Sequence, residues 1–350
     1  MKSNRSILYH LAFLALPLGL APAAHAALFF WDNGGAGENY NTPGNWSPDG
    51  IPGAADLAVH NNGSNGVIQI TQNQSADSLR LTNGGSVNHT GGTLTIANGA
   101  GGDNGLWVGE FGPGQSTYTL SGGTITINDP NDGFMVGRAG NSNGRFNFNS
   151  GVVSMTVGDT HVGLDGVAAW NQSSGTFNGA GVHIGRFQSP TATVALSGNA
   201  IWASNLVLLS DSAAAFSAAI ESRLSLTGPS VNYLSNGLVV RSKGNIDFNG
   251  SGGGISTMSI GSGQLLLDNG RLNLFNLPTP TTIGQQITLI ANIGSYTGQS
   301  QFQNAPDGTN FSGWELDYRS NSIVLVSTVP EPSAALLGSL GVLALLRRRR

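Results

Sequence analysis

A short motif that ends in glycine recurs in the middle of this chain of 350 residues, and it constrains the fold more than any other feature. Each copy places Val or Ile directly before the glycine, and the copies are residues 106–109, 134–137, 160–163 and 182–185. Successive glycines are 28, 26 and 22 residues apart, and a second, alternating segment that ends in Ser-Gly follows each copy. A period of this size is typical of a protein built from stacked repeat units.

Each unit holds two or three short segments in which apolar and polar residues alternate, which predicts short β-strands. Gly, Asn and Ser separate the segments, as sharp turns require, and no helical pattern lies between them. The sequence therefore predicts an all-β solenoid, a parallel β-helix whose coils contain about 22–31 residues, closed by a β-rich C-terminal cap. An antiparallel β-sandwich or a propeller is the alternative.

The repeat predicts which side chains form columns when the coils stack. Because side chains alternate along a strand, the residue before each glycine and the residue two positions earlier should point into the core. These inward residues are Val108, Val136, Val162 and Ile184, with Leu106, Phe134, Thr160 and Val182. The residues between them should form a column on the outer face, a candidate ligand face made of Trp107, Met135, His161 and His183.

The N-terminus has the three parts of a cleaved secretory signal. Lys2 and Arg5 precede an apolar stretch over residues 7–20, and Ala24 and Ala26 form the small-x-small pattern that signal peptidase accepts. The apolar stretch is shorter than a membrane-spanning helix requires, which makes an uncleaved anchor the weaker alternative. We expect cleavage after Ala26 and export of the remaining chain.

The C-terminus has a motif, a short apolar segment and a basic end, in that order. Val329, Pro330, Glu331 and Pro332 precede an apolar run over residues 334–346, and the chain ends in Arg347, Arg348, Arg349 and Arg350. Arginines resist translocation, so the tail should insert transiently in the membrane with its end in the cytoplasm. It resembles the PEP-CTERM sorting signal of Gram-negative bacteria. That resemblance implies processing by an exosortase and display at the cell surface or in the extracellular matrix; an ordinary tail anchor is the alternative.

The segment after the signal contains Trp31, an Asn-Trp pair at residues 45–46, a Pro-containing turn, and Asp56 before a short apolar run. With the repeats, it resembles the autotransporter-like β-helix proteins that often carry such tails. The resemblance implies a right-handed β-helix whose first coil caps its open end. We expect a signal at 1–26, a β-helical body at 27–276 with its cap at 27–88, a C-terminal β cap at 277–328 and the sorting tail at 329–350.

Composition excludes several classes of function. Charged residues make up 10% of the chain, and between the two end segments 9 basic residues face 18 acidic ones, a net charge near −9. Nucleic-acid binding needs a basic surface, so nucleic acid is not an expected partner. The chain has no cysteine, which excludes disulfides and thiolate metal sites.

Candidate chemistry is sparse. Residues Glu110, Arg138, Asp165 and Arg186 follow the repeated glycines and could form a charged cluster, although a solvated ladder explains them more simply. His161 and His183 share a repeat position and could lie ~5 Å apart, but no third metal ligand shares it. The segment 128–133 has the oxygen ligands of a weak Ca²⁺ loop, yet it lacks a distal Glu, and a plain Asx turn is favoured.

No catalytic motif stands out in the sequence, so we expect no enzyme and no cofactor or metal. The first hypothesis is an exported structural or adhesive protein of the cell surface or extracellular matrix. A carbohydrate-binding module that uses the column from Trp107 to His183 is the alternative, with extracellular polysaccharide as its partner. A polysaccharide lyase or hydrolase on a β-helix is a third hypothesis, which would require two carboxylates about 5–10 Å apart.

Overall fold

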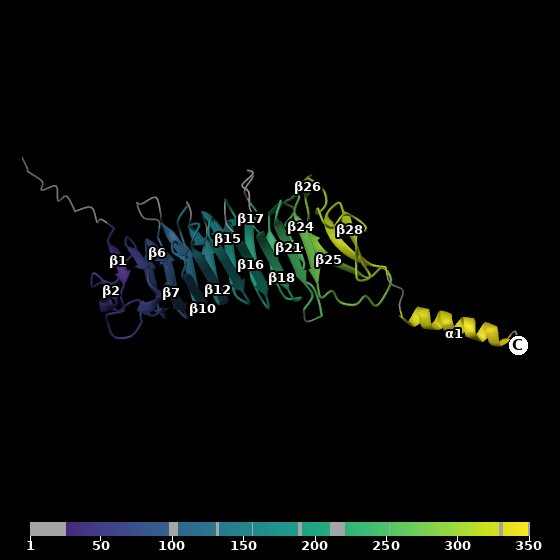
Figure 1. Ribbon diagram of the computed structural model, residues 1–350, viewed down its shortest axis with the longest axis horizontal. Helices are drawn as coiled ribbons and strands as arrows, with labels where there is room; N and C mark the ends of the chain where they lie inside the picture. The colour runs from purple at the N-terminus through teal and green to yellow at the C-terminus, as the bar shows by residue number, and fades with distance from the viewer. Residues whose placement is uncertain are drawn as a thin grey trace, which may run out of the picture.

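The structure is a computed structural model that describes residues 26–97, 104–130, 133–155, 157–187, 191–210, 221–251, 253–328 and 332–348. Over these residues the chain winds into a parallel β-solenoid of about nine turns, drawn out along one axis (Figure 1). The predicted parallel β-helix is therefore confirmed.

Each turn contributes to three sheets among the described residues. The first sheet ends at the repeated glycines and contains β1 (Leu28–Trp31), β3 (Leu57–His60), β6 (Ser78–Leu81), β9 (Gly105–Val108), β11 (Phe134–Val136), β13 (Asp159–Val162), the second halves of β15 (Thr176–Ile184) and β17 (Ile201–Leu209), β20 (Gly237–Arg241), β23 (Gln264–Asp268) and β26 (Ser295–Gly298).

The second sheet contains β4 (Ile68–Ile70), β7 (Ser86–His89), the first halves of β10 (Gln115–Ile127) and β12 (Asn143–Met155), β14 (Val167–Gln172), β16 (Thr191–Ser197), β18 (Glu221–Thr227), β21 (Gly244–Asn249) and β24 (Arg271–Phe275). The third sheet contains β5 (Gln74–Ala76), β8 (Thr93–Ile96), the second halves of β10 and β12, the first halves of β15 and β17, β19 (Asn232–Ser235), β22 (Met258–Ser259) and β25 (Gln286–Ala291).

The repeated glycine has a conformational cause. Gly109, Gly137, Gly163 and Gly185 have φ values of 78°, 71°, 78° and 70°, a region that glycine enters without the steric penalty of a side chain. Each one ends a strand of the first sheet and turns the chain toward the next. The motif therefore marks a corner of the coil.

The predicted inward columns are confirmed. Leu106, Phe134, Thr160 and Val182 pair in register across the first sheet, as do the residues that directly precede the glycines, and all eight side chains are fully buried. Large aromatic side chains fill the centre, such as Trp170, which lies 4.5 Å from Phe146 and 5.5 Å from Trp202 between ring centroids. Such close aromatic packing favours one register of the coils over its alternatives.

Polar side chains form ladders along the outside of the coils. Asn171 Nδ2 donates to Asn147 Oδ1 at 3.1 Å, one coil away, and Asn276 Nδ2 donates to Asn249 Oδ1 at 2.9 Å. Ser150 Oγ donates to the Ser121 carbonyl at 2.6 Å. These bonds join successive turns, so the polar residues contribute to stacking as well as to solubility.

The N-terminal end is closed by a buried cluster. The rings of Trp31 and Trp46 meet edge to face with centroids 5.1 Å apart, and Tyr40 packs 5.0 Å from Trp46. The Asn45 side chain is buried and bonds to Gly35 N and to the carbonyls of Gly37 and Asn39. Two short 3₁₀ turns, Pro43–Asn45 and Gly63–Asn65, and β2 (Trp46–Ser47), antiparallel to β1, complete this region. Both tryptophans thus pack a cap and offer no platform for sugars.

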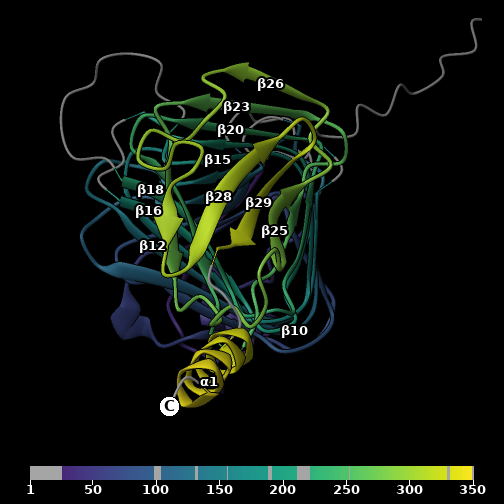
Figure 2. The ribbon, with the colours of Figure 1, turned by 90° about the vertical axis from the view of Figure 1, so that its right-hand side faces the viewer.

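The C-terminal end of the solenoid is covered by antiparallel strands. The strands β28 (Trp314–Arg319) and β29 (Ser322–Ser327) pair with each other, β29 pairs with β25, and β27 (Asn310–Phe311) pairs with β28. Figure 2, seen from this end, shows β28 and β29 lying across the end of the solenoid. Parallel pairing continues past residue 277, since β26 still stacks on β23.

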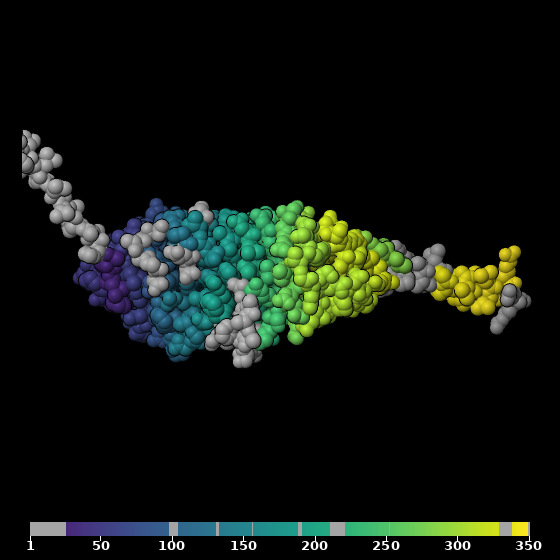
Figure 3. Space-filling view, turned by 90° about the horizontal axis from the view of Figure 1, so that it is seen from above, coloured from purple at the N-terminus to yellow at the C-terminus, as the bar shows by residue number. Residues whose placement is uncertain are grey.

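The Ala/Ser-rich stretch 210–226 contains the strand β18 from Glu221 onward, while residues 211–220 lie outside the described residues. The helix α1 (Pro332–Arg348) stands apart from the body (Figure 3). Within the described residues, no helix has both the length and the apolar character needed to cross a membrane.

Candidate functional site

The predicted outer column exists in register, but the prediction that its side chains form an exposed face was wrong. Trp107 pairs with Met135, Met135 with His161, and His161 with His183. Trp107, Met135 and His161 are 1%, 2% and 0% exposed, so the first three side chains of the column are buried although they point away from the solenoid centre. These three buried side chains cannot stack on a sugar, and the candidate ligand face is corrected accordingly; His183 alone keeps partial exposure.

Charged side chains account for the burial of Trp107. The guanidinium carbon of Arg80 lies 3.9 Å from the Trp107 ring centroid, and that of Arg138 lies 4.3 Å from it. The same arginines approach Glu110 Oε1 at 3.3 Å and 3.6 Å. The Glu110 side chain is 6% exposed. The cluster is thus a buried carboxylate between two cations that cover an aromatic ring, an arrangement that holds neighbouring turns together.

The solvated ladder expected from the sequence is reproduced in its register, but it is not fully solvated, because Glu110 is buried. Backbone bonds place Arg138 N on Gly109 O, Leu164 N on Gly137 O and Arg186 N on Gly163 O. Glu110, Arg138 and Arg186 therefore share a column, as predicted, with Leu164 in place of a charge between the two arginines. Arg186 extends over the Phe187 ring, 4.8 Å from its centroid. No second carboxylate joins Glu110 in this column among the described residues, so the pair of acids that glycoside hydrolysis needs is not seen there.

The two histidines stack as the shared repeat position predicts. The rings of His161 and His183 have centroids 4.8 Å apart and an interplanar angle of 27°. His183 Nε2 lies 3.4 Å from Asp159 Oδ2. Across the described ranges, no group of three or more His, Asp or Glu side chains is arranged to hold a metal ion. In the expected Ca²⁺ loop, Asp129 is buried, and residues 131–132 lie outside those ranges.

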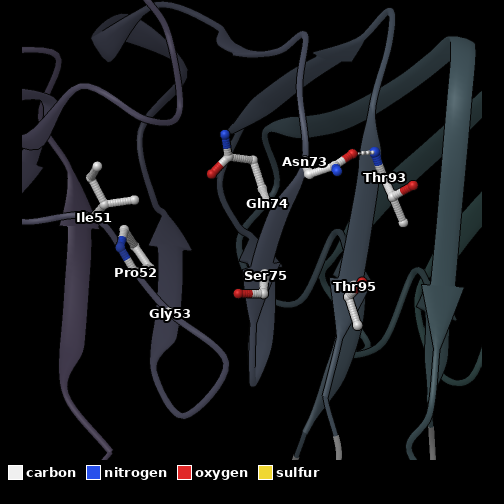
Figure 4. Close-up of a pocket in the computed structure, with 8 residues that line it drawn as sticks. All are labelled: Ile51, Pro52, Gly53, Asn73, Gln74, Ser75, Thr93 and Thr95. Carbon is white, nitrogen blue, oxygen red and sulfur yellow. Dashed lines mark hydrogen bonds between the residues drawn. The ribbon is translucent and has the colours of Figure 1, made fainter.

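The third sheet carries a hollow that the sequence reasoning missed. It has a volume of about 590 Å³ and lies between the segment 51–53 and the first strands of the sheet (Figure 4). Its lining is uncharged and consists of Ile51, Pro52, Gly53, Asn73, Gln74, Ser75, Thr93 and Thr95. Asn73 Oδ1 accepts a hydrogen bond from Thr93 N at 2.9 Å, which ties the loop before β5 to β8.

The polar row that leaves this hollow continues along the solenoid. Ser75 pairs with Thr95, Thr95 with Thr126, Thr126 with Ser154 and Ser154 with Asn178. A second hollow of about 210 Å³ lies farther along the same sheet and is lined by Met155, Asn178, Gly179, Ala203, Ser204, Asn205, Leu234 and Asn236. The sequence signal for this face was the repeated Thr-x-Thr at 93–95 and 124–126.

The residues of the predicted processing signals fall mostly outside the described ranges. This holds for Val329, Pro330, Glu331, Arg349, Arg350 and Ala24. Pro332 begins α1, and Arg347 and Arg348 end it. Ala26 is described and exposed, and the next residue, Ala27, forms a hydrogen bond with Asp56 of the cap.

Comparisons with known proteins assign no family. No protein-family model matches the chain, and no curated protein or solved structure is similar enough to it to count as a match. The function of the chain is therefore inferred from its residues and its fold.

Proposed function

We propose that this protein is an exported, non-catalytic structural element of the bacterial cell surface or extracellular matrix, sorted by its PEP-CTERM-like tail. The observation that carries the proposal is the stack of parallel coils closed at both ends by antiparallel strands. Caps of this kind stop unpaired strand edges from recruiting other chains, so the body acts as a spacer of fixed length.

The chemistry of the body supports this role. One charged cluster of the described residues is committed to internal contacts, with Glu110 held between Arg80 and Arg138. Asp247 is likewise buried, and it pairs with Arg223 and accepts a hydrogen bond from Asn273 Nδ2 at 2.8 Å. Ionisable side chains that are paired in this way hold stacked coils together, and they are not free to act as catalytic acids or bases.

The test is the intact mass and location of the protein in its native cell. We expect loss of residues 1–26, loss of the tail near Pro330–Pro332, and release of the body to the cell surface or medium. A chain that keeps its tail and stays in the inner membrane would refute sorting and leave a simple anchor. A variant with Glu331→Ala should block tail removal while leaving N-terminal cleavage unchanged.

Carbohydrate binding is the second candidate, and the third sheet favours it over the buried column of Trp107. The 590 Å³ hollow has the size of a small-ligand site, and it combines amide and hydroxyl groups with an apolar wall at Ile51 and Pro52. The row from Ser75 to Asn178 repeats hydrogen-bonding groups at the coil spacing of about 4.8 Å. A neutral polysaccharide laid along the solenoid axis is the ligand that this uncharged face suits.

Affinity electrophoresis of the protein in gels that contain neutral or acidic polysaccharides tests this candidate. We expect a neutral polymer to retard the protein, and we expect this retardation to be weaker for Gln74→Ala and Thr95→Ala. Thr119→Ala, a matched change on the second sheet, should be retarded as much as the unmodified protein. Equal mobility of all variants in every gel would remove the candidate.

A further inference from the structure

A carboxylate of the cap holds the backbone nitrogen of one particular residue. Ala27 N donates to Asp56 Oδ1 at 3.0 Å, and Gly53 N donates to Asp56 Oδ2 at 2.8 Å. Leu57 N donates to the Ala27 carbonyl at 2.8 Å, and Leu28 pairs with Leu57. Both sides of the Ala27 backbone are therefore fixed to the segment 56–57, at the start of the first sheet.

A separate observation from the sequence points to the same residue. The small-x-small pattern of Ala24 and Ala26 predicts that signal peptidase cuts between Ala26 and Ala27. Hydrolysis of that bond adds water across it, leaving a carboxylate on Ala26 and an amine on Ala27. The amine binds a proton at neutral pH, because the ordinary pKa of an α-amino group is about 7.7–8.0.

We infer that Asp56 is the binding site for the new N-terminus, and that cleavage converts a neutral backbone hydrogen bond into an ion pair that locks the first strand of the solenoid. The inference rests on the proposed export of the chain. The nitrogen that carries the new charge is the atom already 3.0 Å from Asp56 Oδ1, so no rearrangement of the cap is required. Charge-assisted hydrogen bonds of this kind are roughly twice as strong as neutral ones.

The surroundings of Asp56 favour an ion pair between its carboxylate and the Ala27 amine. Asp56 is half-buried, and its own carbonyl accepts bonds from Asp77 N and Ser78 N, which hold the residue in place. The turn at 53–56 closes with Asp56 N donating to the Gly53 carbonyl at 2.9 Å. Tyr40 is close enough for the Asp56 charge to add to the rise in its pKa, which is caused mainly by burial. A positive charge at Ala27 offsets this carboxylate within the cap.

The experiment uses the chain from Ala27 to Arg350, released from a removable tag so that Ala27 carries a free amine. NMR titration of the ¹⁵N-labelled α-amine should give a pKa clearly above the ordinary range, and the shift should vanish in Asp56→Asn. Asp49→Asn, which removes one charge from an exposed position of the same region, should leave the raised pKa in place. An α-amine that titrates in the ordinary range in the unmodified chain would overturn the inference.

A second measurement does not depend on the folding of the Asp56 variant. In the chain without substitutions, acetylation of the Ala27 amine should lower the urea midpoint of unfolding at pH 6. Above pH 10 the free amine is neutral, so the midpoints of the free and acetylated chains should become equal. An identical midpoint for free and acetylated chains at pH 6 would also refute the ion pair. N-terminal sequencing of protein from native cells tests cleavage separately: a start other than Ala27 would refute the processing premise whatever the titration gives.

Discussion

Arg80 lies over the indole ring of Trp107, with its guanidinium carbon 3.9 Å from the ring centroid. Because the two residues come from adjacent coils paired in register, this contact explains why an outward-pointing tryptophan is buried. Trp107→Ala should lower the free energy of unfolding by about 3–5 kcal/mol, as removal of a buried aromatic does. Urea denaturation measures this loss. Trp107→Phe should lose less than half of the free energy that Trp107→Ala loses.

The same variant separates packing from ligand binding. If Trp107 packs the coil, folded Trp107→Ala protein should keep any retardation by neutral polysaccharide in affinity gels. Selective loss of binding with unchanged stability would restore the outer column as a ligand face.

Glu110 neutralises two arginines in a largely buried setting. Glu110→Gln should cost about 3 kcal/mol, because it removes the carboxylate that pairs with both arginines in this largely buried setting. Thermal and urea unfolding measure the loss, and the exposed Glu315→Gln in the C-terminal cap serves as a control. Equal stability of the two variants would mean that the Glu110 pairs are solvated and contribute little.

Gly137 should tolerate no side chain. Its φ is 71°, and an added Cβ would lie 2.5 Å from the Val167 carbonyl oxygen of the next coil. We expect Gly137→Ala to lower stability by more than about 1 kcal/mol, the cost of a strained backbone conformation before any clash is counted. Gly140→Ala provides the matched comparison, since nothing lies within 4 Å of its added Cβ, and its midpoint should not fall.

Buried histidines should make the body less stable in mild acid. Burial lowers the pKa of His89 and of His60, although hydrogen bonds to the carbonyls of Gly92 and Gly66 oppose the shift. A lowered pKa means that the unfolded chain binds more protons, so this contribution is complete above the ordinary pKa of about 6.5 and declines as the pH falls below it. Urea midpoints at pH 7.5 and pH 5 should differ less in His89→Gln than in the unmodified chain.

Asn304 closes the exposed edge of the second sheet. Its Oδ1 accepts from Leu272 N at 2.9 Å and its Nδ2 donates to the Leu272 carbonyl at 2.8 Å, so one side chain replaces a neighbouring strand. Asn304→Ala should cost about 1–3 kcal/mol and promote self-association through β24. Light scattering should detect larger species for this variant and few for Asn310→Ala. A monomeric Asn304→Ala protein would show that other parts of the cap protect the edge.

Several structural features could be predicted from the sequence because they depend on the repeat period and on the alternation of side chains along a strand. The spacing of the repeated glycines predicted the coils, and strict alternation predicted that Val108 and Leu106 point inward and that His161 stacks on His183. These relationships are local or repeat from coil to coil, so a single strand pattern determines them. Export and sorting also rest on contiguous residues, and they stay predictions.

Other features depended on contacts between coils. No pattern in residues 104–110 shows that Arg80, about one coil earlier, covers Trp107, and an outward position was therefore taken as exposed. The hollow beside β5 exists because the segment 51–53 stands next to a sheet built from residues that follow it by more than 20 positions. The sequence alone determined the repeat and the direction of the side chains in its motif copies, and it predicts the signals at both ends. Only the tertiary structure decided which outward side chains are buried and that Ala27 N meets Asp56, because burial and long-range pairing depend on the neighbours that stacking brings together.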